Sequence, residues 1–452
     1  MNLARLLKAR AAEGRPVRVG VIGAGKFASM FLAQARTTPG LHVLGVADLD
    51  VQRARDALAR TGWGDSAVAA DFDTARKSGR MALTDDAMAL IKSDAEVIID
   101  ITGSPAAGIR HALAAFDHGK HFVNVTVEAD VLAGPLLAER ARRAGVVYAL
   151  AYGDQPALVC EMVDWAEAAG FRVVAAGKGT KYLPAYERST PDTVWQHYGL
   201  TAEEAKAAGM NSQMFNSFLD GTKSAIEMAA ISNATGLQAP RSGLAFPPCS
   251  ADDLSRILIP RAAGGVLEEA GLVEVVSSLD RDGRPIARDL RWGVYIVFEP
   301  GDERSDYTRR SFREYGIVTD SSGRYASLYR PYHLIGLELG ISVAAAALRG
   351  EATGSPTGFR SDVAAIAKKA LAPGDMLDGE GGYTVMGKLM RAEDSLAAGA
   401  LPIGLAHKLK VVRPVAEGAV VRWDDVAVPD SDTVRFRREM ERAFAPKKSA
   451  AA

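Results

Sequence analysis

The sequence predicts an α/β protein in which a parallel sheet is followed by an α+β part and then by a small β-rich part. Strand-like and helix-like runs alternate through the first 155 residues, which is typical of a parallel sheet with helices on both faces. Long helical runs surround a few strands from residue 156 to 350, and short strands between Pro-Gly and Glu-Gly turns follow. Because 452 residues are too many for one core, we expect domains at 1–155, 156–350 and 351–452.

Apolar runs predict the strands of the first domain, and periodic patterns predict the helices between them. The expected strands are 17–23, 41–48, 95–102, 121–126 and 146–152, and the clearest helices are 50–61 and 105–119. In the second domain we expect helices at 156–170, 201–209, 220–236 and 331–349, and strands that begin at residues 171, 271 and 291. The last two strands flank residues 280–285, a hairpin signal. Residues 350–358 are expected to form a linker, and residues 444–452 a disordered tail.

Composition is that of an ordinary soluble globular protein. Lysine and arginine number 54 and aspartate and glutamate 55, so the net charge favours neither a nucleic acid nor an anionic membrane as partner. The two cysteines, Cys160 and Cys249, are too few for a disulfide framework, and residues 1–16 lack the apolar core of a secretory signal. The longest apolar runs, such as 341–348, are shorter than the roughly 20 residues that span a bilayer. We therefore expect a cytoplasmic protein without a membrane anchor.

The most informative motif is the turn after the first strand, Gly23-x-Gly25-x-x-Ala28, with Lys26 and Phe27 inside it. Gly23 permits the tight strand-to-helix turn, Gly25 lets the backbone approach a pyrophosphate, and Ala28 lets the helix pack on the strand. The unpaired N–H groups at the helix N-terminus suit phosphates. The motif predicts a Rossmann-type dinucleotide site.

The cofactor is expected to be NADPH or NADH. Asp48 ends the second strand, where its carboxylate could accept both ribose hydroxyls of NAD. Arg53 and Arg55 follow on the next helix, where a guanidinium could instead hold the 2′-phosphate of NADP. In the alternative, these residues have no ligand: Asp48 only ends a strand, and the arginines form a solvated helix face.

Two loops at strand ends are candidates for the nicotinamide side of the site. Thr102 and Gly103 follow the strand at 95–102, and Glu128 follows the strand at 121–126. Alternatively, Thr102 and Ser104 cap the helix that begins near Pro105. Asp154 follows the last strand of the domain, as a substrate contact at the hinge or as a helix N-cap, and we expect both roles.

Candidate catalytic residues of the second domain include several lysines. Lys178 and Lys181, two lysines among glycines at a strand end, could hold a phosphate or carboxylate or donate a proton; a solvated loop is the alternative. Asp220, Lys223 and Glu227 are spaced to share one helix face, where an acid and a lysine could transfer protons. In the alternative, Asp220 is an N-cap and Lys223 with Glu227 an ordinary helix pair.

A cluster of arginines and tyrosines ends at His333. Arg330 could hold a phosphate or carboxylate, and His333 could act as acid or base or cap the apolar helix expected from Pro331. No His-x-x-x-His or Cys-x-x-Cys spacing occurs, so we assign no metal site; a divalent ion would need scattered carboxylates such as Asp154 or Glu227.

Beyond these motifs, the chain resembles homoserine-dehydrogenase-like oxidoreductases with a C-terminal SAF domain, a β-clip module. The resemblance rests on GVIGAGKFA, VADLD, AYGDQP, GKGTKY, DGTKSAIEMA and LYRPYHLIGLE, and on the tail motifs KKALAPGDMLDGEGGYTV and LPIGLAHKLKVVRPVAEGAVVRWDDV. One branch of this group is similar to 1-deoxy-D-xylulose 5-phosphate reductoisomerase and makes 2-C-methyl-D-erythritol 4-phosphate with NADPH for isoprenoid synthesis. The resemblance also implies a homodimer.

The chain departs from true homoserine dehydrogenases at two places. Gly179-Thr180-Lys181-Tyr182 is a compressed form of their Gly-Thr-x-Asn-Tyr segment, and Asp220 and Lys223 are three rather than four residues apart. These departures favour a phosphorylated substrate over homoserine. The resemblance then implies that Lys178, Lys181 and Arg330 hold the phosphate, while Lys223, Asp220 and His333 handle protons. An isomerisation step would benefit from a divalent ion.

Two alternatives stay open at this point. The chain could be a homoserine-dehydrogenase-like dehydrogenase of another hydroxy acid. It could also be a dinucleotide-binding regulator without turnover, although such a protein would not need the Asp220 and Lys223 pair.

Overall fold

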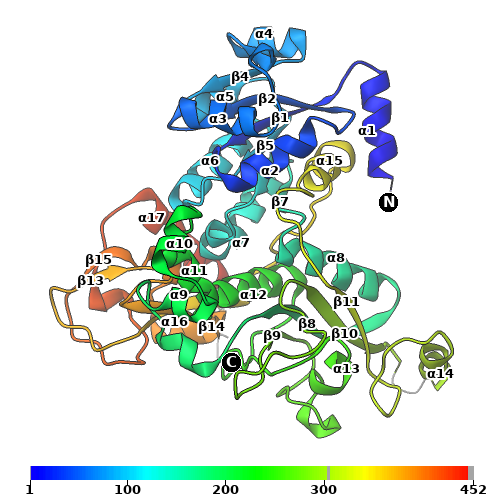
Figure 1. Ribbon diagram of the computed structural model, residues 1–452, viewed down its shortest axis with the longest axis vertical. Helices are drawn as coiled ribbons and strands as arrows, with labels where there is room; N and C mark the ends of the chain where they lie inside the picture. Colours follow the sequence, from blue (N-terminus) through cyan, green and yellow to red (C-terminus); the bar gives the residue numbers. More distant parts are fainter. Residues whose placement is uncertain (1, 303–305, 446–452) are drawn as a thin grey trace, which may run out of the picture. The chain divides into compact units, whose positions relative to one another are not determined.

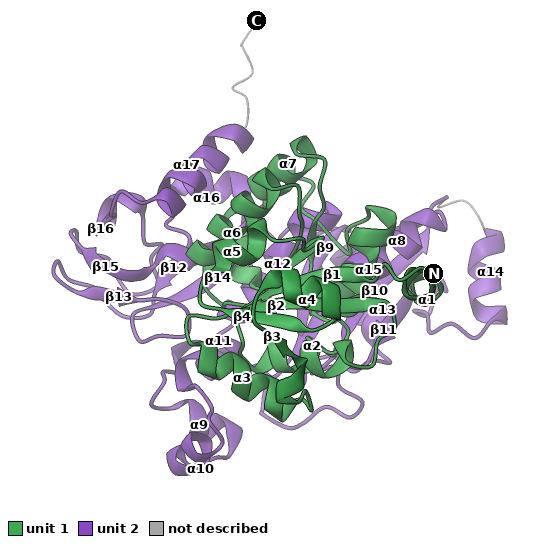
Figure 2. Cartoon of the chain, turned by 90° about the horizontal axis from the view of Figure 1, so that it is seen from above, with its two compact units in different colours: residues 1–158, 333–357 green, residues 159–332, 358–452 purple. Residues whose placement is uncertain are grey.

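The computed structural model describes residues 2–302 and 306–445 and divides the chain into two compact units (Figure 2). Unit 1 consists of residues 1–158 and 333–357, and unit 2 of residues 159–332 and 358–452. Residues 333–357, expected in the second and third domains, therefore pack with the first part of the chain. The C-terminal residues from 358 share a unit with the α+β part.

Unit 1 is built on a seven-stranded sheet with the order β3-β4-β2-β1-β5-β6-β7 (Figure 1). All of its strand pairs are parallel, which confirms the expected fold class. The strands are β1 (Val17–Ile22), β2 (Leu41–Ala47), β3 (Val68–Ala69), β4 (Met81–Thr84), β5 (Val97–Asp100), β6 (His121–Asn124) and β7 (Tyr148–Leu150). The sequence analysis missed β3 and β4, whose runs are too short to show a period.

The helices of unit 1 include one that is distant in sequence. The N-terminal helices are α1 (Leu3–Ala12), α2 (Lys26–Ala35), α3 (Val51–Arg60), α4 (Phe72–Ser78), α5 (Ala87–Lys92), α6 (Pro105–Asp117) and α7 (Val127–Arg143). The later helix α15 (Gly340–Arg349) packs into the same core, where Val343 and Ala344 are fully buried. The helix expected from Pro331 thus starts only at Gly340. Gly336, with φ +81°, lies against α2, so this stretch is a turn and not helix.

The expected linker is held along β7. Leu150 donates its N–H to the Gly354 carbonyl at 2.7 Å, and the Thr353 hydroxyl donates to the Leu150 carbonyl at 2.7 Å. These bonds satisfy the edge of β7 and fasten residues 353–354 to unit 1.

Unit 2 contains a mixed four-stranded sheet with the order β11-β10-β8-β9. Its strands are β8 (Phe171–Thr180), β9 (Leu272–Ser277), β10 (Val294–Pro300) and β11 (Ala326–Arg330). The expected hairpin between β9 and β10 is wrong, because β8 lies between them, parallel to β9 and antiparallel to β10. Only the local turn forms, where Asp280 donates its N–H to the Arg284 carbonyl at 2.8 Å.

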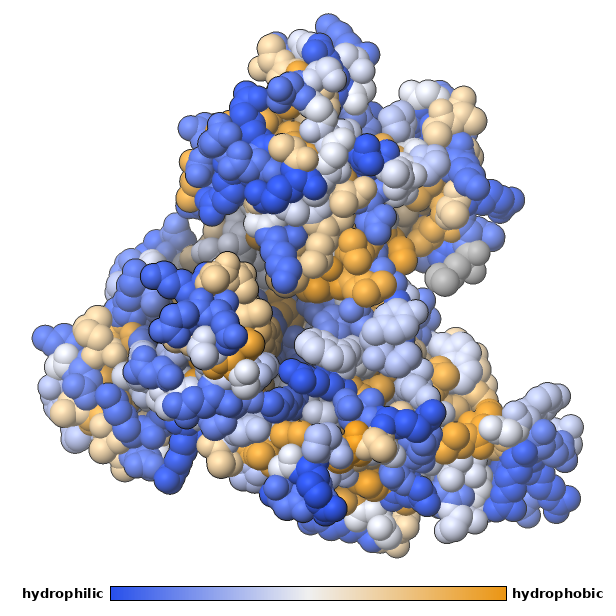
Figure 3. All heavy atoms as spheres, in the orientation of Figure 1, coloured by the Kyte–Doolittle hydropathy of each residue, from blue (hydrophilic) through white to orange (hydrophobic). Residues whose placement is uncertain are grey.

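The helices of unit 2 lie mainly between β8 and β11 in sequence. They are α9 (Val194–Tyr198), α10 (Ala202–Ala207), α11 (Ser212–Leu219), α12 (Thr222–Thr235), α13 (Leu254–Ile257) and α14 (Asp306–Glu314); α8 (Gln155–Ala168) begins in unit 1 and ends in unit 2. Figure 3 shows the surface over α14 as hydrophilic, in keeping with Phe312 as its buried residue. No helix among the described residues is long and apolar enough to cross a membrane.

The C-terminal segment, residues 358–445, is β-rich as expected. Strand β12 (Ser361–Ala367) pairs antiparallel with β14 (Val385–Arg391), and β15 (His407–Val411) pairs with β13 (Met376–Asp378) and β16 (Val426–Ala427). Helices α16 (Ala392–Ala398) and α17 (Asp432–Phe444) complete it. Phe444, the first residue of the expected disordered tail, ends α17, and residues 446–452 lie outside the described residues.

Helix α12 connects the two parts of unit 2. It contacts β8 and β9 of the mixed sheet and also β12 and β14 of the C-terminal segment. Its residues from Ser224 to Asn233 are all buried, since both sides of the helix are covered. The start of this helix is therefore placed by segments far apart in the sequence.

Candidate functional site

The glycine turn in unit 1 has the geometry of a phosphate cradle. Gly23 has φ +101°, and a Cβ on it would lie 2.8 Å from the Ile101 carbonyl oxygen. Gly25 is the N-cap of α2, and a Cβ added there would meet no atom within 4 Å. Ala28 is fully buried, while Lys26 and Phe27 are exposed. Open space above a helix N-terminus is where a pyrophosphate would be held by backbone N–H groups.

Asp48 is fully engaged at the end of β2. Its Oδ2 accepts the Ala24 N–H at 2.7 Å, so the carboxylate fastens the glycine turn to the neighbouring strand. Its Oδ1 accepts bonds from Arg53 Nε at 3.0 Å and from an Arg53 terminal nitrogen at 2.7 Å. The structure therefore distinguishes the two arginines: Arg53 sits on the acid, whereas Arg55 is exposed on α3.

The loops after β5 and β6 meet at the same edge of the sheet as the glycine turn. Ile22, Asp100 and Asn124 are register partners on adjacent strands. Gly103 donates its N–H to the Thr126 hydroxyl at 3.0 Å, which joins the two loops. Glu128 lies in the first turn of α7. Parallel sheets bind ligands at this edge.

Part of this edge is structural. The fully buried Asp100 accepts a bond from the Thr102 hydroxyl at 2.8 Å and lies 2.6 Å from His111 Nδ1. Ser104 is the N-cap of α6, as expected in the alternative in which this loop caps the helix. Its hydroxyl accepts the Ala107 N–H at 3.4 Å. The hydroxyl of Thr102 therefore points to Asp100 and does not cap the helix.

Asp154 occupies the N-cap position of α8. Its Oδ1 accepts the Gln155 N–H at 2.9 Å, and its side chain lies among buried groups at 7% exposure. This carboxylate belongs to unit 1, whereas the lysines of the expected site belong to unit 2.

Residues 177–180, the segment GKGT, are part of strand β8 and not a loop after it. Gly177 and Gly179 are required because the backbone of neighbouring segments lies close to them. Cβ atoms at these positions would lie 1.8 Å from the Glu274 carbonyl oxygen and 1.9 Å from the Leu290 carbonyl oxygen. These two glycines therefore serve the packing of neighbouring backbone segments. Lys178 lies between them, points toward α12 and forms a buried ion pair with Glu227. Its charge is already neutralised, which argues against a phosphate-holding role.

Lys181 lies beyond the end of β8 in a cationic neighbourhood. Its ammonium group donates to the His197 carbonyl and lies 5.5 Å from the centroid of the Tyr198 ring. The Arg291 guanidinium lies 6.0 Å from the same centroid and 4.8 Å from that of Trp292. Burial, and then the nearby Arg291 charge, lower the pKa of Lys181. Among residues 2–302 and 306–445, no carboxylate forms an ion pair with either cation. The two positive charges could therefore bind an anionic ligand.

The expected acid and lysine on one helix face are arranged differently. Helix α12 starts at Thr222 behind Gly221, which has φ +87°, and Asp220 is the last residue of the preceding turn, at the C-cap of α11. Asp220 pairs with Lys368 at 3.0 Å and Glu227 with Lys178, so the expected one-face arrangement of Asp220, Lys223 and Glu227 is wrong. Lys223 is half-buried in the first turn of α12.

The Arg324–His333 cluster is divided. Arg330 ends β11, opposite Val294, which is in turn opposite Lys178. Residues in register point to the same side of a sheet, so Arg330 lies two strand spacings, roughly 10 Å, from Lys178 on the same face. His333 belongs to unit 1 and lies in an irregular stretch before α15, so the expected capping role at a helix start is wrong.

Side chains of the metal-ligand types are scattered in the part of the chain that is described. No group of three or more His, Cys, Asp or Glu side chains there is placed to hold an ion. Glu227, one of the carboxylates considered, is paired with Lys178.

Sequence reasoning missed two residues of this site, Arg291 and Lys368. Arg291 reaches the end of β8 because Gly179 lets its backbone approach: a Cβ on Gly179 would lie 2.9 Å from the Arg291 nitrogen. Lys368 follows β12, about 150 residues after Asp220 in the chain. Neither residue carries a local signal, since both contacts depend on tertiary packing.

Residues 153–339, less than half of the chain, match the family model described as "Oxidoreductase DRL, catalytic domain". This part of the chain is therefore similar to an oxidoreductase catalytic domain. The matched region contains β8, α12 and every candidate residue of unit 2 except Lys368.

Solved structures and curated proteins add less. The chain is similar to myo-inositol dehydrogenase from Lactobacillus casei, in complex with NAD(H) and myo-inositol, at 16% identity and TM-score 0.28, over 40% of this chain and 50% of that one. It is similar to scyllo-inositol dehydrogenase from Lactobacillus casei, with NAD(H) and scyllo-inositol, at 11% identity and TM-score 0.34, over 63% and 73%. The chain thus spans half the length of the first of these structures. No curated protein matches the sequence significantly.

Proposed function

We propose that the protein is an NAD(P)H-dependent reductase of a small sugar-phosphate or polyol-type carbonyl compound, acting in the manner of a reductoisomerase. The observation that carries the proposal is the Lys181–Arg291 pair, two cations beside the Tyr198 ring with no carboxylate partner among the described residues. A phosphate is the dianion that such a pair would bind. The pair lies in the region that matches an oxidoreductase catalytic domain.

Unit 1 would hold the dinucleotide. Gly23, Gly25 and the start of α2 would bind the pyrophosphate, and the loops with Thr102, Gly103 and Glu128 would lie toward the nicotinamide. The pair of Asp48 and Arg53 supports NADPH, because the guanidinium is already in place where a 2′-phosphate would be bound. When bound, the cofactor supplies a hydride.

Unit 2 would hold the substrate. Lys181 and Arg291 would bind the phosphate, and Arg330, on the same sheet face as Lys178, would bind a second oxygen-rich group. The buried Lys178–Glu227 pair would hold a proton beside Lys223, which is one helical turn before Glu227. Lys178, or Lys223 from the same helix as Glu227, would donate a proton to the developing alkoxide.

Two residues of unit 1, the identity of the C-terminal segment and the oligomeric state remain predictions. His333 and Asp154, both in unit 1, remain candidate proton-handling and substrate residues. The SAF identity of the C-terminal segment and the homodimer also remain predictions of the resemblance. We route no step through a metal ion, since the described carboxylates form no cluster.

The test is turnover with NADPH and NADH against a panel of ketose phosphates, hydroxy acids and homoserine, followed at the nicotinamide absorbance. We expect oxidation of the cofactor with a phosphorylated substrate. Arg291→Met should raise its KM by about 10–100-fold, the loss of one charge-assisted contact, and Lys181→Met should act similarly. Arg288→Met is the matched control, because Arg288 lies in the same segment but is paired with Asp252 at 2.7 Å. Turnover of an unphosphorylated compound alone would refute the proposed substrate class.

A further inference from the structure

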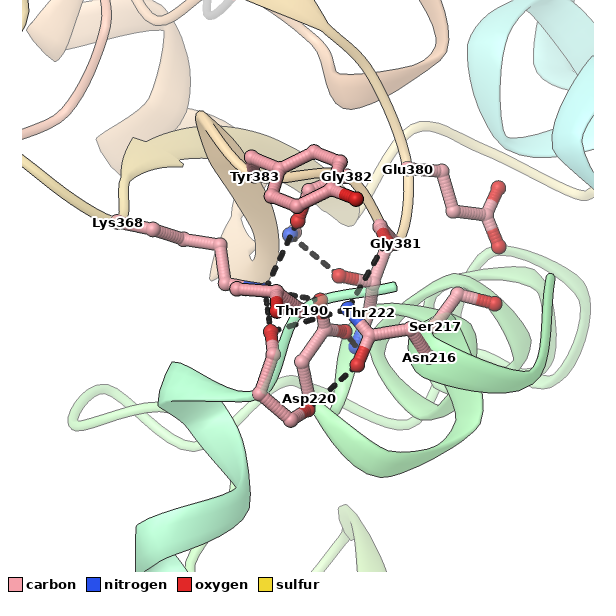
Figure 4. A network of polar contacts seen from close by, with 12 residues as sticks. Thr190, Asn216, Ser217, Asp220, Thr222, Lys368, Glu380, Gly381, Gly382 and Tyr383 are labelled. Carbon is pink, nitrogen blue, oxygen red and sulfur yellow. Dashed lines mark hydrogen bonds and ion pairs between the residues drawn. The ribbon is translucent and has the colours of Figure 1, made fainter. Parts of the chain in front are cut away.

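Lys368 reaches the candidate site from the C-terminal segment. Its ammonium group pairs with Asp220 Oδ2 at 3.0 Å and donates to the Ser189 carbonyl at 2.6 Å and the Gly382 carbonyl at 3.2 Å (Figure 4). The side chains of Lys368 and Asp220 are 4% and 0% exposed. All three donor positions of the ammonium group are therefore used inside the protein.

The surrounding loop is closely fitted to α11. Gln213 donates its side-chain amide to the Asp378 and Glu380 carbonyls at 2.8 and 2.9 Å, and Asn216 donates to the Gly381 carbonyl at 2.8 Å. Gly381 has φ +66°, and a Cβ on it would lie 2.1 Å from the Gln213 carbonyl oxygen. A side chain at this position would clash with α11, so glycine is required for the close approach of the loop.

The same segment also contacts the first residue of α12. Gly387 of β14 donates its N–H to the Thr222 hydroxyl at 2.8 Å, and Thr222 in turn donates its N–H to Asp220 Oδ1 at 3.0 Å. The turn 220–222, from which α12 presents Lys223, is thus held on one side by Lys368 and on the other by Gly387.

The Lys368 charge acts directly on the Asp220 carboxyl group. Burial raises the pKa of Asp220, and the Lys368 charge is the first influence that opposes this rise, followed by the hydrogen bonds from Thr222. Among charged groups on the elements packed nearby, Lys178 and Glu227 pair with each other, and Asp378 accepts the backbone N–H groups of Tyr383 and Thr384. Lys223 is a further cation, on the first turn of α12.

We propose that Lys368 is a positioning residue of the active site: it pairs with Asp220 and fixes the turn that starts α12, so the C-terminal segment contributes to the catalytic centre. The inference rests on the proposed function for its kinetic consequence. Its structural content, the dependence of the start of α12 on Lys368, stands independently.

The experiment compares Lys368→Met, Lys368→Arg, Asp220→Asn and the Asp220→Asn/Lys368→Met double variant, with Lys369→Met as control, since Lys369 is the exposed neighbour. The kinetic readout is the pH profile of kcat. We expect Lys368→Met to lower kcat by about 100-fold at neutral pH and to move the acidic limb upward by at least about one pH unit, because Asp220 then holds its proton more tightly. Lys368→Arg should restore most of the activity.

The double variant tests whether Lys368 acts through Asp220. It should be no slower than Asp220→Asn alone, since the two residues act as a unit. It also removes both buried charges, so it keeps the test decisive if Lys368→Met fails to fold. An unmoved pH profile, or a double variant with fully additive losses, would overturn the inference.

A second readout separates this inference from the proposed function. Hydrogen exchange of the α12 amides should become at least tenfold faster in Lys368→Met and should be unchanged in Lys369→Met, whatever the substrate is. If the wild-type enzyme turns over none of the phosphorylated compounds, the proposed substrate class is wrong while this readout still applies. Unchanged exchange in Lys368→Met would overturn the positioning role itself.

Discussion

Asp130 on α7 makes the stability of unit 1 depend on pH. Its side chain is fully buried, and its Oδ1 accepts one hydrogen bond, from the Tyr148 hydroxyl at 2.9 Å. Its Oδ2 has no partner among the described residues. Burial without a cation raises the pKa of Asp130 from 3.8 to about 7. The folded state therefore keeps a proton that the unfolded state has lost.

The sign and size of the effect follow from this difference. Because the pKa is raised in the folded state, the contribution of Asp130 is fully present below about pH 4 and is lost as pH rises toward 7. Three pKa units correspond to a loss of about 4 kcal/mol over that range. We expect Asp130→Asn, which keeps the shape and removes the charge, to abolish this loss, so the variant should be more stable than the wild type by about 4 kcal/mol at pH 8 and by a smaller margin at pH 5.

Native-state hydrogen exchange of α7, β6 and β7 amides at pH 5 to 8 measures this without interference from unit 2. Asp117→Asn is the control, because Asp117 is an exposed carboxylate at the end of α6. Parallel pH dependences of wild type and Asp130→Asn would refute the reasoning.

Two further predictions concern ion pairs at the candidate sites. Arg53→Ala should weaken NADPH binding by about tenfold or more, with NADH binding retained, because it removes the guanidinium beside Asp48 and frees that carboxylate for ribose hydroxyls. Fluorescence titration with each cofactor measures the two affinities, and Arg55→Ala is the control on the same helix. Equal losses of affinity for both cofactors would contradict the prediction. Lys178→Met should destabilise unit 2 by about 3–5 kcal/mol, because it leaves the Glu227 carboxylate buried and unpaired. Adding Glu227→Gln should recover most of this loss, and urea unfolding measures the stability of both variants. A loss below about 1 kcal/mol in Lys178→Met would argue against a buried charge pair.

Local signals predicted unit 1 well. The parallel sheet, the glycine turn and the position of Asp48 could be inferred because each depends on residues close together in the chain: β-branched runs, a glycine that adopts positive φ, and an acid at a strand end. The short strands β3 and β4 escaped because two to four residues cannot display a period.

Unit 2 was predicted in outline only. The sequence indicated its strands and the long helix α12, yet the expected hairpin failed because β8 inserts between β9 and β10. Strand neighbours are chosen by which apolar faces can be buried together, and no spacing within β9 or β10 encodes that choice.

The class of fold, the dinucleotide-type turn in unit 1 and the charged residues available for chemistry could all be inferred from local sequence. The pairing of these charges depends on tertiary packing: Lys178 pairs with Glu227, Asp220 pairs with Lys368, and Lys181 lies beside Arg291. Spacing favoured a different pairing along one helix. The buried charges of Lys178 and Asp220 are each paired with the opposite charge that packing places beside them, because an unpaired buried charge costs about 3–5 kcal/mol.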